Sequence, residues 1–328
     1  MKKNIRWGIM GPGNIAHKFA AGLAVVPDAE LAAVASRSLE KANAFADKYN
    51  IPLRYGSYED LAADDSIDVV YVATPHSAHL ECALLCLEAG RAVLCEKPLT
   101  VNAAQAQKLI ATARERRVFL MEAMWTRFFP IMKQVEDWLA AGAIGEVRLV
   151  SADFGFRGAW NPEGRLFKPE LAGGSLLDVG VYTVSFAEWV MGEPPQRITG
   201  LAHLGETGVD EQAAMVLAYN GGRLATLTSA VRTTTIQSAW IYGTGGYIHL
   251  PAFWHPTAAT LNIPGKEPLK VEIPLLGNGY NYEAAAVNQC LKEGKLECER
   301  MPHRESLSIL KTMDTLRRQW GLKYPMEE

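Results

Sequence analysis

The segment Ile9-Met10-Gly11-Pro12-Gly13-Asn14-Ile15-Ala16 decides the fold of this 328-residue chain. It joins an apolar run to a stretch of helical periodicity and has the G-x-G-x-x-A pattern of a dinucleotide-binding turn. Gly11 permits the tight turn, Gly13 lets the backbone approach a pyrophosphate, and Ala16 allows the helix to pack closely on the strand. Free amides at the helix start, with Asn14 and Ile15 in the first turn, predict a phosphate site. A glycine-rich turn without a ligand is the alternative.

Outward from this turn, short apolar runs alternate with helical stretches as far as residue 123. The expected strands are Ile5 to Met10, Leu31 to Ser36, Ile67 to Thr74, Ala92 to Cys95 and Val118 to Ala123, and the expected helices are Asn14 to Val25, Leu39 to Tyr49, Ser77 to Ala89 and Asn102 to Arg116. Such alternation is typical of βαβ units with right-handed crossovers. We therefore expect an α/β fold, a Rossmann-type doubly wound parallel sheet with helices on both faces.

The pattern changes after Glu122. Three further helical stretches flank a set of runs with period-two alternation, several of which end in Gly or Asn, a pattern that is typical of hairpins. The expected strands are Val147 to Phe156, Ile198 to Leu204, Gln212 to Tyr219, Arg223 to Val231 and Ser238 to Tyr242, and the expected helices are Phe129 to Ala141, Tyr282 to Lys292 and Glu305 to Trp320. We expect a dinucleotide-binding Rossmann domain over 1–122 and, over 123–328, an α+β domain with a large, mostly antiparallel open sheet for substrate binding and oligomerisation.

Composition excludes several classes of function. The net charge of −3, without a long basic run, argues against nucleic acid as a partner. No apolar stretch is long enough for a membrane span, and the first residues lack the apolar core of a signal peptide. The five cysteines are odd in number and form no C-x-x-C pair, so we expect a reduced, cytoplasmic protein.

The end of the second expected strand bears on the choice of cofactor. Enzymes that use NAD usually carry Asp or Glu there to bind the ribose 2′-hydroxyl. This chain has Ser36 and Arg37 instead, and a guanidinium is suited to clamp a 2′-phosphate. We expect NADP as the cofactor, with NAD possible; a solvated Arg37 in a loop is the alternative.

Two later segments resemble one family. Cys95-Glu96-Lys97-Pro98-Leu99 follows an expected strand, and Gly173-Gly174-Ser175-Leu176-Leu177-Asp178-Val179-Gly180-Val181-Tyr182 opens an expected helix. Together with the glycine turn they are similar, in order and spacing, to the motifs of the Gfo/Idh/MocA oxidoreductase family. Met124 to Pro130 and Thr74 to His79 are similar to its dimeric dihydrodiol dehydrogenase and NADP-dependent D-xylose dehydrogenase branch.

The resemblance implies a set of catalytic residues. Asp178 and Tyr182, four residues apart on a helix with Ser175 as a possible N-cap, are expected to share one face that Lys97 of the first domain meets. Tyr182 would shuttle the proton, Lys97 would polarise the substrate oxygen, and Asp178 would orient Lys97 or bind a substrate hydroxyl. Glu96 would hold the cofactor ribose or pair locally.

Other residues are expected to line the site. Thr74, Pro75, His76 and His79 follow a strand end and are expected beside the nicotinamide; the His-x-x-His spacing lacks further ligands, so no metal site is expected. Trp125, Arg127, Phe154 and Trp160 are expected to wall a substrate pocket, with ordinary core or interface packing as the alternative.

The sequence thus predicts an NADP-dependent oxidoreductase that transfers a hydride between nicotinamide and a hydroxyl or carbonyl carbon of a sugar or cyclic diol. A non-catalytic NADP(H)-binding sensor and a purely structural subunit of the same fold are the alternatives. The resemblance also implies a homodimer or a dimer of dimers, paired through the C-terminal sheet. The substrate, the physiological direction and the hydride face stay open at this stage.

Overall fold

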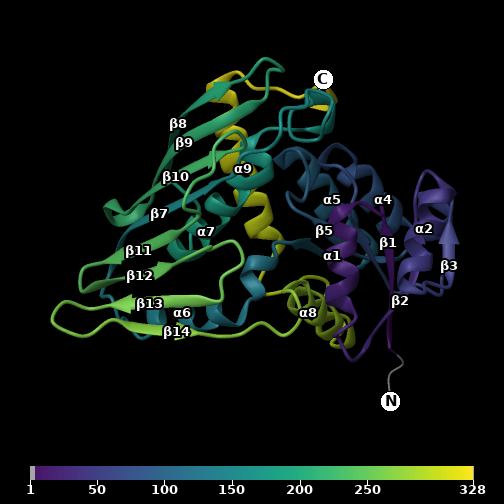
Figure 1. Cartoon of the computed structure of the whole chain (residues 1–328), viewed down its shortest axis with the longest axis horizontal. Helices are drawn as coiled ribbons and strands as arrows, with labels where there is room; N and C mark the ends of the chain where they lie inside the picture. Colours follow the sequence, from purple (N-terminus) through teal and green to yellow (C-terminus); the bar gives the residue numbers. More distant parts are fainter. Residues whose placement is uncertain (1–3, 328) are drawn as a thin grey trace. The chain divides into compact units, whose positions relative to one another are not determined.

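The computed structural model describes residues 4–327, which form two compact units (Figure 1). The first unit holds the chain up to Phe128 together with Leu276–Ser306. The second holds Phe129–Leu275 together with the chain from Leu307 onward. These units differ from the expected ranges 1–122 and 123–328, because residues 276–306 return to pack with the first unit.

The first unit is built on a six-stranded sheet in which every described pair of neighbours is parallel. Its order is β3-β2-β1-β4-β5-β6, with β1 (Ile5–Met10), β2 (Ala29–Ala35), β3 (Leu53–Tyr55), β4 (Val69–Val72), β5 (Ala92–Glu96) and β6 (Leu120–Ala123). The helices between them are α1 (Asn14–Leu23), α2 (Leu39–Tyr49), α3 (Tyr58–Ala63), α4 (His79–Glu88) and α5 (Ala103–Arg116). Strands β4, β5 and β6 are buried throughout, as expected for parallel strands covered on both faces. The predicted Rossmann-type sheet is confirmed.

Helix α8 (Tyr280–Lys292) explains why a late segment belongs to this unit. It packs so closely on α1 that a Cβ added to Gly22 would lie 2.8 Å from the Tyr280 Cβ atom. The indole nitrogen of Trp7 in β1 also donates to the Asn288 side chain of α8 at 3.0 Å. Both contacts join residues more than 250 positions apart, so local sequence patterns did not predict them.

The second unit is built on an eight-stranded sheet of order β14-β13-β12-β11-β7-β10-β9-β8. The strands are β7 (Val147–Gly155), β8 (Arg197–Leu204), β9 (Asp210–Ala218), β10 (Leu224–Ala230), β11 (Ala239–Gly243), β12 (Gly246–Leu250), β13 (Ala258–Asn262) and β14 (Leu269–Glu272). Among the described pairs β7 and β10 run parallel and the other neighbours run antiparallel. The predicted large, mostly antiparallel sheet is therefore confirmed.

Helices cover one face of this sheet. Helix α7 (Val181–Met191) contacts β7 and β10, α6 (Pro130–Ala140) contacts β13, and α9 (His303–Trp320) reaches β8, where the Trp320 indole donates to Gly200 O at 2.9 Å. Side chains along β8 alternate between half-buried and exposed, as expected for a sheet with one covered face. None of the described helices is long and apolar enough to cross a membrane.

Candidate active site

The glycine turn leaves open space in front of a helix. Gly11 has φ +93°, which favours glycine, and a Cβ there would lie 3.1 Å from Ala73 O. Gly13 is the residue before α1; no side chain caps the helix, and a Cβ added to Gly13 would have nothing within 4 Å. Asn14 and Ile15 open the helix with backbone amides that α-helical geometry leaves unpaired. This cradle fits the pyrophosphate of a dinucleotide.

The loop after β2 carries the residues predicted to select the cofactor. Ser36 is buried, and its hydroxyl accepts a hydrogen bond from Ser38 N at 3.2 Å. Arg37 is exposed, and its charge acts on the phenol of Tyr58 in α3. Burial raises the pKa of Tyr58, and Arg37 partly opposes that rise. Tyr58 was not predicted as part of this site, because α3 has only six residues and too little periodicity to predict.

His79 joins two strand ends. Its ring is fully buried, with Nε2 3.0 Å from Thr74 O and Nδ1 2.8 Å from Pro98 O. The His76 ring lies edge-on to it at 5.7 Å. His79 thus holds the loop after β4 against the Glu96-Lys97-Pro98 turn. Contacts of Thr74, Pro75, His76 and His79 with a cofactor stay predictions. Within residues 4–327 no group of three His, Cys, Asp or Glu side chains suits a metal ion.

The Glu96 carboxylate has protein partners on both oxygens. Oε1 accepts a hydrogen bond from the Tyr71 phenol, and Oε2 accepts one from the backbone N–H of Lys97 at 3.1 Å. Glu283 of α8 is fully buried nearby, and burial raises the pKa of its carboxyl well above the usual range. These bonds favour the local-pairing alternative for Glu96, while they fix the backbone at Lys97.

Trp125 and Arg127 lie in a short helical turn after β6 in the first unit. The Trp125 ring stacks on Tyr280 with centroids 4.2 Å apart. The Arg127 guanidinium pairs with Glu305 at 2.6 Å and is almost fully buried. Both side chains therefore have packing partners within their own unit, and their place in a substrate wall stays a prediction.

Asp178 and Tyr182 lie on one continuous helical segment of the second unit. Residues Leu176–Gly180 form a π-helical turn that runs directly into α7. The expectation that Ser175 is the N-cap was wrong: its backbone is already helical and its side chain makes no capping bond. Its hydroxyl instead donates to the buried Asp210 carboxylate.

An aromatic cluster surrounds Tyr182. The Phe154 ring lies 5.4 Å from the Tyr182 ring and stacks on Trp254 at 4.9 Å. The Asp178 carboxylate accepts a hydrogen bond from Arg165 at 2.7 Å, a partner the sequence did not indicate. Trp254 was also missed, because it lies about a hundred residues after Phe154 and outside any expected element.

Trp160 has a different setting in the same unit. It is 40% exposed, packs against Phe167 at 4.8 Å between ring centroids, and carries the Arg232 guanidinium over its face at 5.0 Å. These contacts stabilise the loop between β7 and the π-helical turn. A contact between Trp160 and a substrate stays a prediction.

This chain belongs to the Gfo/Idh/MocA family of oxidoreductases. The family's NAD-binding Rossmann-fold model matches residues 5–124, and the model of its C-terminal domain matches residues 132–249. The protein is therefore an oxidoreductase that works with a nicotinamide cofactor.

Individual relatives cover the whole chain. It is 44% identical to trans-1,2-dihydrobenzene-1,2-diol dehydrogenase of Xenopus tropicalis, over 98% of this chain and 99% of the relative. Identity to the human protein of the same name is 38%, over 99% of each. A solved 3-ketoreductase from Actinomadura kijaniata, in complex with NADP and TDP-benzene, matches with a TM-score of 0.87 and 27% identity over 96% of this chain and 98% of that one.

Proposed function

We propose that this protein is an NADP-dependent dehydrogenase of a sugar or a cyclic diol. The observation that carries the proposal is the full-length similarity to trans-1,2-dihydrobenzene-1,2-diol dehydrogenases, at 38–44% identity in frog and human. The ketoreductase bound to NADP supports the cofactor. Arg37, which occupies the end of β2 where NAD enzymes carry a carboxylate, supports NADP over NAD.

In the proposed mechanism, nicotinamide supplies or accepts the hydride when it is bound. The chain handles the proton and the geometry. During oxidation Tyr182, as the phenolate, takes the proton of the substrate hydroxyl, and the Lys97 ammonium stabilises the negative charge that develops on the substrate oxygen. Phe154 and Trp254 present flat apolar faces of the kind that suit a sugar or a diol ring. Asp178, held by Arg165, binds a further hydroxyl.

Tyr182→Phe tests the proton step. We expect kcat to fall about 100-fold or more, as for loss of a general acid–base group, with the dissociation constant of NADPH unchanged. Turnover is followed at about 340 nm, where reduced nicotinamide absorbs, on panels of aldoses, dihydrodiols and dicarbonyls in both directions. Tyr282→Phe, at a half-buried tyrosine of α8 in the first unit, is the matched control. Near-normal turnover by Tyr182→Phe contradicts its assignment.

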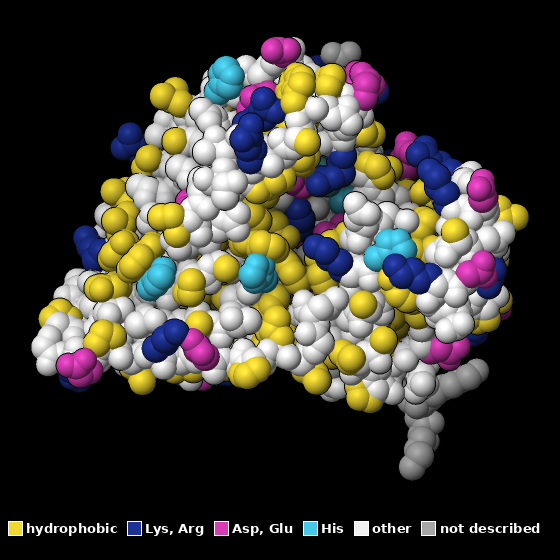
Figure 2. All heavy atoms as spheres, in the orientation of Figure 1, with side chains coloured by type: hydrophobic (Ala, Val, Ile, Leu, Met, Phe, Trp, Pro, Cys, Tyr) yellow, Lys and Arg dark blue, Asp and Glu magenta, His cyan; other side chains and the backbone are white. Residues whose placement is uncertain are grey.

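We also propose that two copies pair through the outer face of the eight-stranded sheet, as a homodimer or a dimer of dimers. Hydrophobic side chains spread over this face, with charged ones mainly at its margins (Figure 2). Leu201 is 82% exposed, and Val216 and Leu224 are each 41% exposed. The rings of Trp240 and His249 stack at 3.9 Å between β11 and β12. An exposed apolar patch of this kind marks an association surface.

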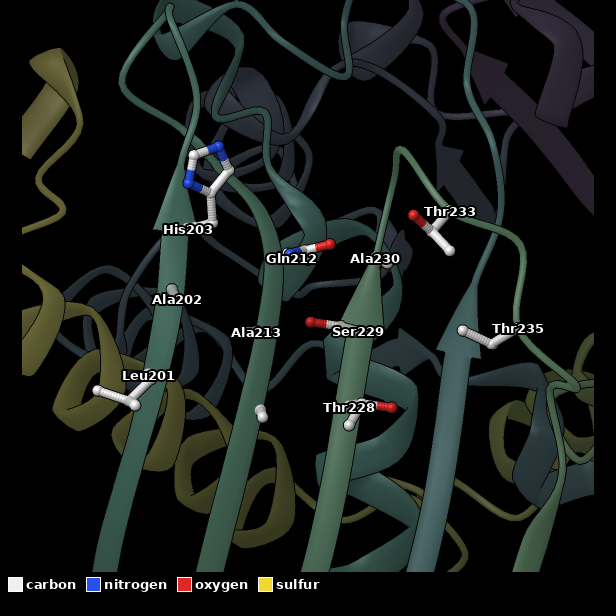
Figure 3. Close-up of a pocket in the computed structure, with 11 residues that line it drawn as sticks. Leu201, Ala202, His203, Gln212, Ala213, Thr228, Ser229, Ala230, Thr233 and Thr235 are labelled. Atoms are coloured by element: carbon white, nitrogen blue, oxygen red, sulfur yellow. The ribbon is translucent and has the colours of Figure 1, made fainter.

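A hollow on the same face offers a place for a partner's side chain. It has a volume of about 420 Å³ and lies over β8, β9 and β10 (Figure 3). Its floor is made of small residues, including Ala213 and Thr228, and Leu201 and His203 stand at its rim. A second copy presents the same apolar rim, as a two-fold interface requires.

Leu201→Arg tests the pairing. The substitution places a charge in the centre of the interface, so the molar mass by light scattering should fall toward that of one chain. Leu276→Arg, at a leucine of the first unit that is 63% exposed, is the control and should leave the mass unchanged. A molar mass that Leu201→Arg leaves unchanged would show that the copies do not pair through this part of the sheet.

We also propose that the protein resides in the cytoplasm, which is a reducing compartment. All five cysteines are buried free thiols, which oxidising compartments rarely leave unpaired. Thiol titration of the denatured, unreduced protein should count five; a lower number would indicate disulfides and another location.

A further inference from the structure

The segment that carries Asp178 and Tyr182 begins in an unusual way. Gly174 has φ +109°, and the next residues enter a π-helical turn rather than an α-helical one. Single π-turns are rare and need local support, because their hydrogen bonds are less favourable than those of an α-helix. The support for this turn must come from outside the segment, since Ser175 does not cap it.

Asp210, the first residue of β9, supplies that support. Its Oδ2 atom accepts a hydrogen bond from Leu176 N at 2.6 Å and another from the Ser175 hydroxyl at 2.7 Å. The same hydroxyl lies 2.9 Å from the Ser229 hydroxyl in β10. A carboxylate at a helix start also interacts favourably with the helix dipole. Three elements are therefore joined at the first residue of the π-turn.

The other carboxylate oxygen, Oδ1, is buried without a hydrogen-bond partner among the described residues. A Cβ added to Gly174 would lie 2.2 Å from it. The carboxylate is thus held in place by contacts to one oxygen and by the close approach of the Gly174 backbone to the other. Only glycine at this position leaves room for the arrangement.

The C-terminal segment contacts the backbone just before the same turn. The Tyr324 phenol donates a hydrogen bond to Gly173 O at 2.5 Å. Arg317 lies 5.0 Å from the Tyr324 ring and is itself held by Glu327 at 2.7 Å and Asp314 at 2.8 Å. Arg317 and Tyr324 are the charged and titratable groups that act on Asp210 from α9 and the tail.

We infer that Asp210 is a positioning residue for Tyr182 and Asp178, through its grip on Ser175 and Leu176. The inference rests on the proposed role of Tyr182. Without the carboxylate, Leu176 N is free to leave the π-turn for an α-helical one. A shift of one residue in register rotates a side chain by about 100° around the helix axis, which separates Asp178 from the face of Tyr182.

Two variants at this position separate charge from hydrogen bonding. Asp210→Ala removes both acceptor and charge, and should lower kcat roughly 10- to 100-fold, as expected for hydrogen bonds to a charged group, with the NADPH dissociation constant unchanged. Asp210→Asn keeps one acceptor oxygen for Ser175 and Leu176. It should therefore restore most of the loss, and kcat should stay within about 5-fold of the wild type.

The pH profile is a further readout. Burial raises the pKa of Asp210 to about 6, with the bonds from Ser175 and Leu176 and the charge of Arg317 opposing the rise. The wild-type kcat should fall toward that of Asp210→Asn as the pH drops through this value, and Asp210→Asn itself should lack that step. A role in folding alone predicts a lower melting temperature and an unchanged pH profile.

Hydrogen exchange separates this inference from the proposed function. In Asp210→Ala the amides of residues 176–182 should exchange faster, and in Asp210→Asn they should resemble the wild type. This holds even if Tyr182→Phe proves active. Glu193→Gln, which alters a carboxylate bound to Asn220 N, is the control and should change neither kcat nor this exchange. Unchanged exchange and kcat in folded Asp210→Ala would overturn the inference; if that variant does not fold, a pH profile of Asp210→Asn identical to the wild type would do so.

Discussion

Two glycine turns lead into helices in this molecule, and they differ in whether a side chain of the protein binds the backbone amides at the helix start. Before α1, no side chain caps the helix, and a Cβ added to Gly13 would have nothing within 4 Å. Before the π-turn, the buried carboxylate of Asp210 fills the corresponding position. Both starts attract an anion for the same electrostatic reason. We propose that the first binds an anion from a ligand, whereas the second is occupied by a carboxylate of the chain itself.

The largest effect should come from a substitution in the glycine turn before the π-helical turn, where the Asp210 carboxylate packs against the backbone. Gly174→Ala puts a Cβ 2.2 Å from the Asp210 Oδ1 atom at a backbone angle of +109°. We expect a loss of about 3 kcal/mol in the free energy of unfolding, from backbone strain and overpacking combined. Chemical denaturation measures it. Gly192→Ala, also at positive φ but with nothing within 4 Å, should lose only about 1 kcal/mol.

The second prediction concerns a carboxylate added to the glycine turn before α1. Gly13→Asp places a carboxylate where the phosphates are proposed to bind, and it should weaken NADPH binding about 50-fold or more by charge repulsion and lost amides. It should stabilise the fold slightly, by about 0.3 kcal/mol, because aspartate is a good N-cap. Fluorescence titration and thermal melting report the two effects. A Gly13→Ala control should fold normally and bind NADPH better than Gly13→Asp does.

The third prediction concerns Arg37, the residue proposed to bind the 2′-phosphate of NADPH. Arg37→Ala should weaken NADPH binding about 20-fold, the value of one charge-assisted contact to a phosphate, and leave NADH binding nearly unchanged. The ratio of the two dissociation constants is the measurement. Arg54→Ala, in neighbouring β3, serves as the control. Equal weakening of both cofactors would remove Arg37 as the 2′-phosphate ligand.

The smallest effect concerns the titration of the Asp210 carboxylate. The folded-state pKa of Asp210, about 6, lies above its ordinary value of 3.8, so the folded protein takes up this proton first as the pH falls. The wild type should therefore gain stability relative to Asp210→Asn between pH 7 and pH 5, by on the order of 1 kcal/mol. Denaturation of both proteins at the two pH values measures the difference. A constant difference would show that Asp210 does not titrate in this range.

Local signals predicted individual elements well. Helix α2 spans Leu39–Tyr49 as expected, because the Ser38 side chain accepts a bond from Lys41 N at its start and Asn50 adopts φ +54° at its end. The glycine turn and the strand before it were equally local. Strand β3 and helix α3 were missed, since three and six residues carry too little periodicity.

The candidate site was predicted unevenly for a related reason. The motifs single out Lys97, Asp178 and Tyr182, whose catalytic roles stay predictions, and Ser175 was wrongly expected to cap the helix. Its true partner, Asp210, lies 35 residues away in another strand. Residue spacing within a motif does not show which distant side chain will satisfy a buried polar group.

The amino-acid sequence by itself therefore determined the two sheets and the glycine turn, because these follow from periodicities and turn residues within a few positions of one another. Its motifs also resemble those of the family to which the chain belongs. Tertiary structure alone decided that α8 returns to the first unit, that Tyr58 lies near Arg37, and that Asp210 and Tyr324 support the turn before Tyr182. The physical reason is that a buried charge or hydroxyl is satisfied by whatever the fold brings beside it, and contacts between residues 35 to 281 positions apart leave no periodic trace in the chain.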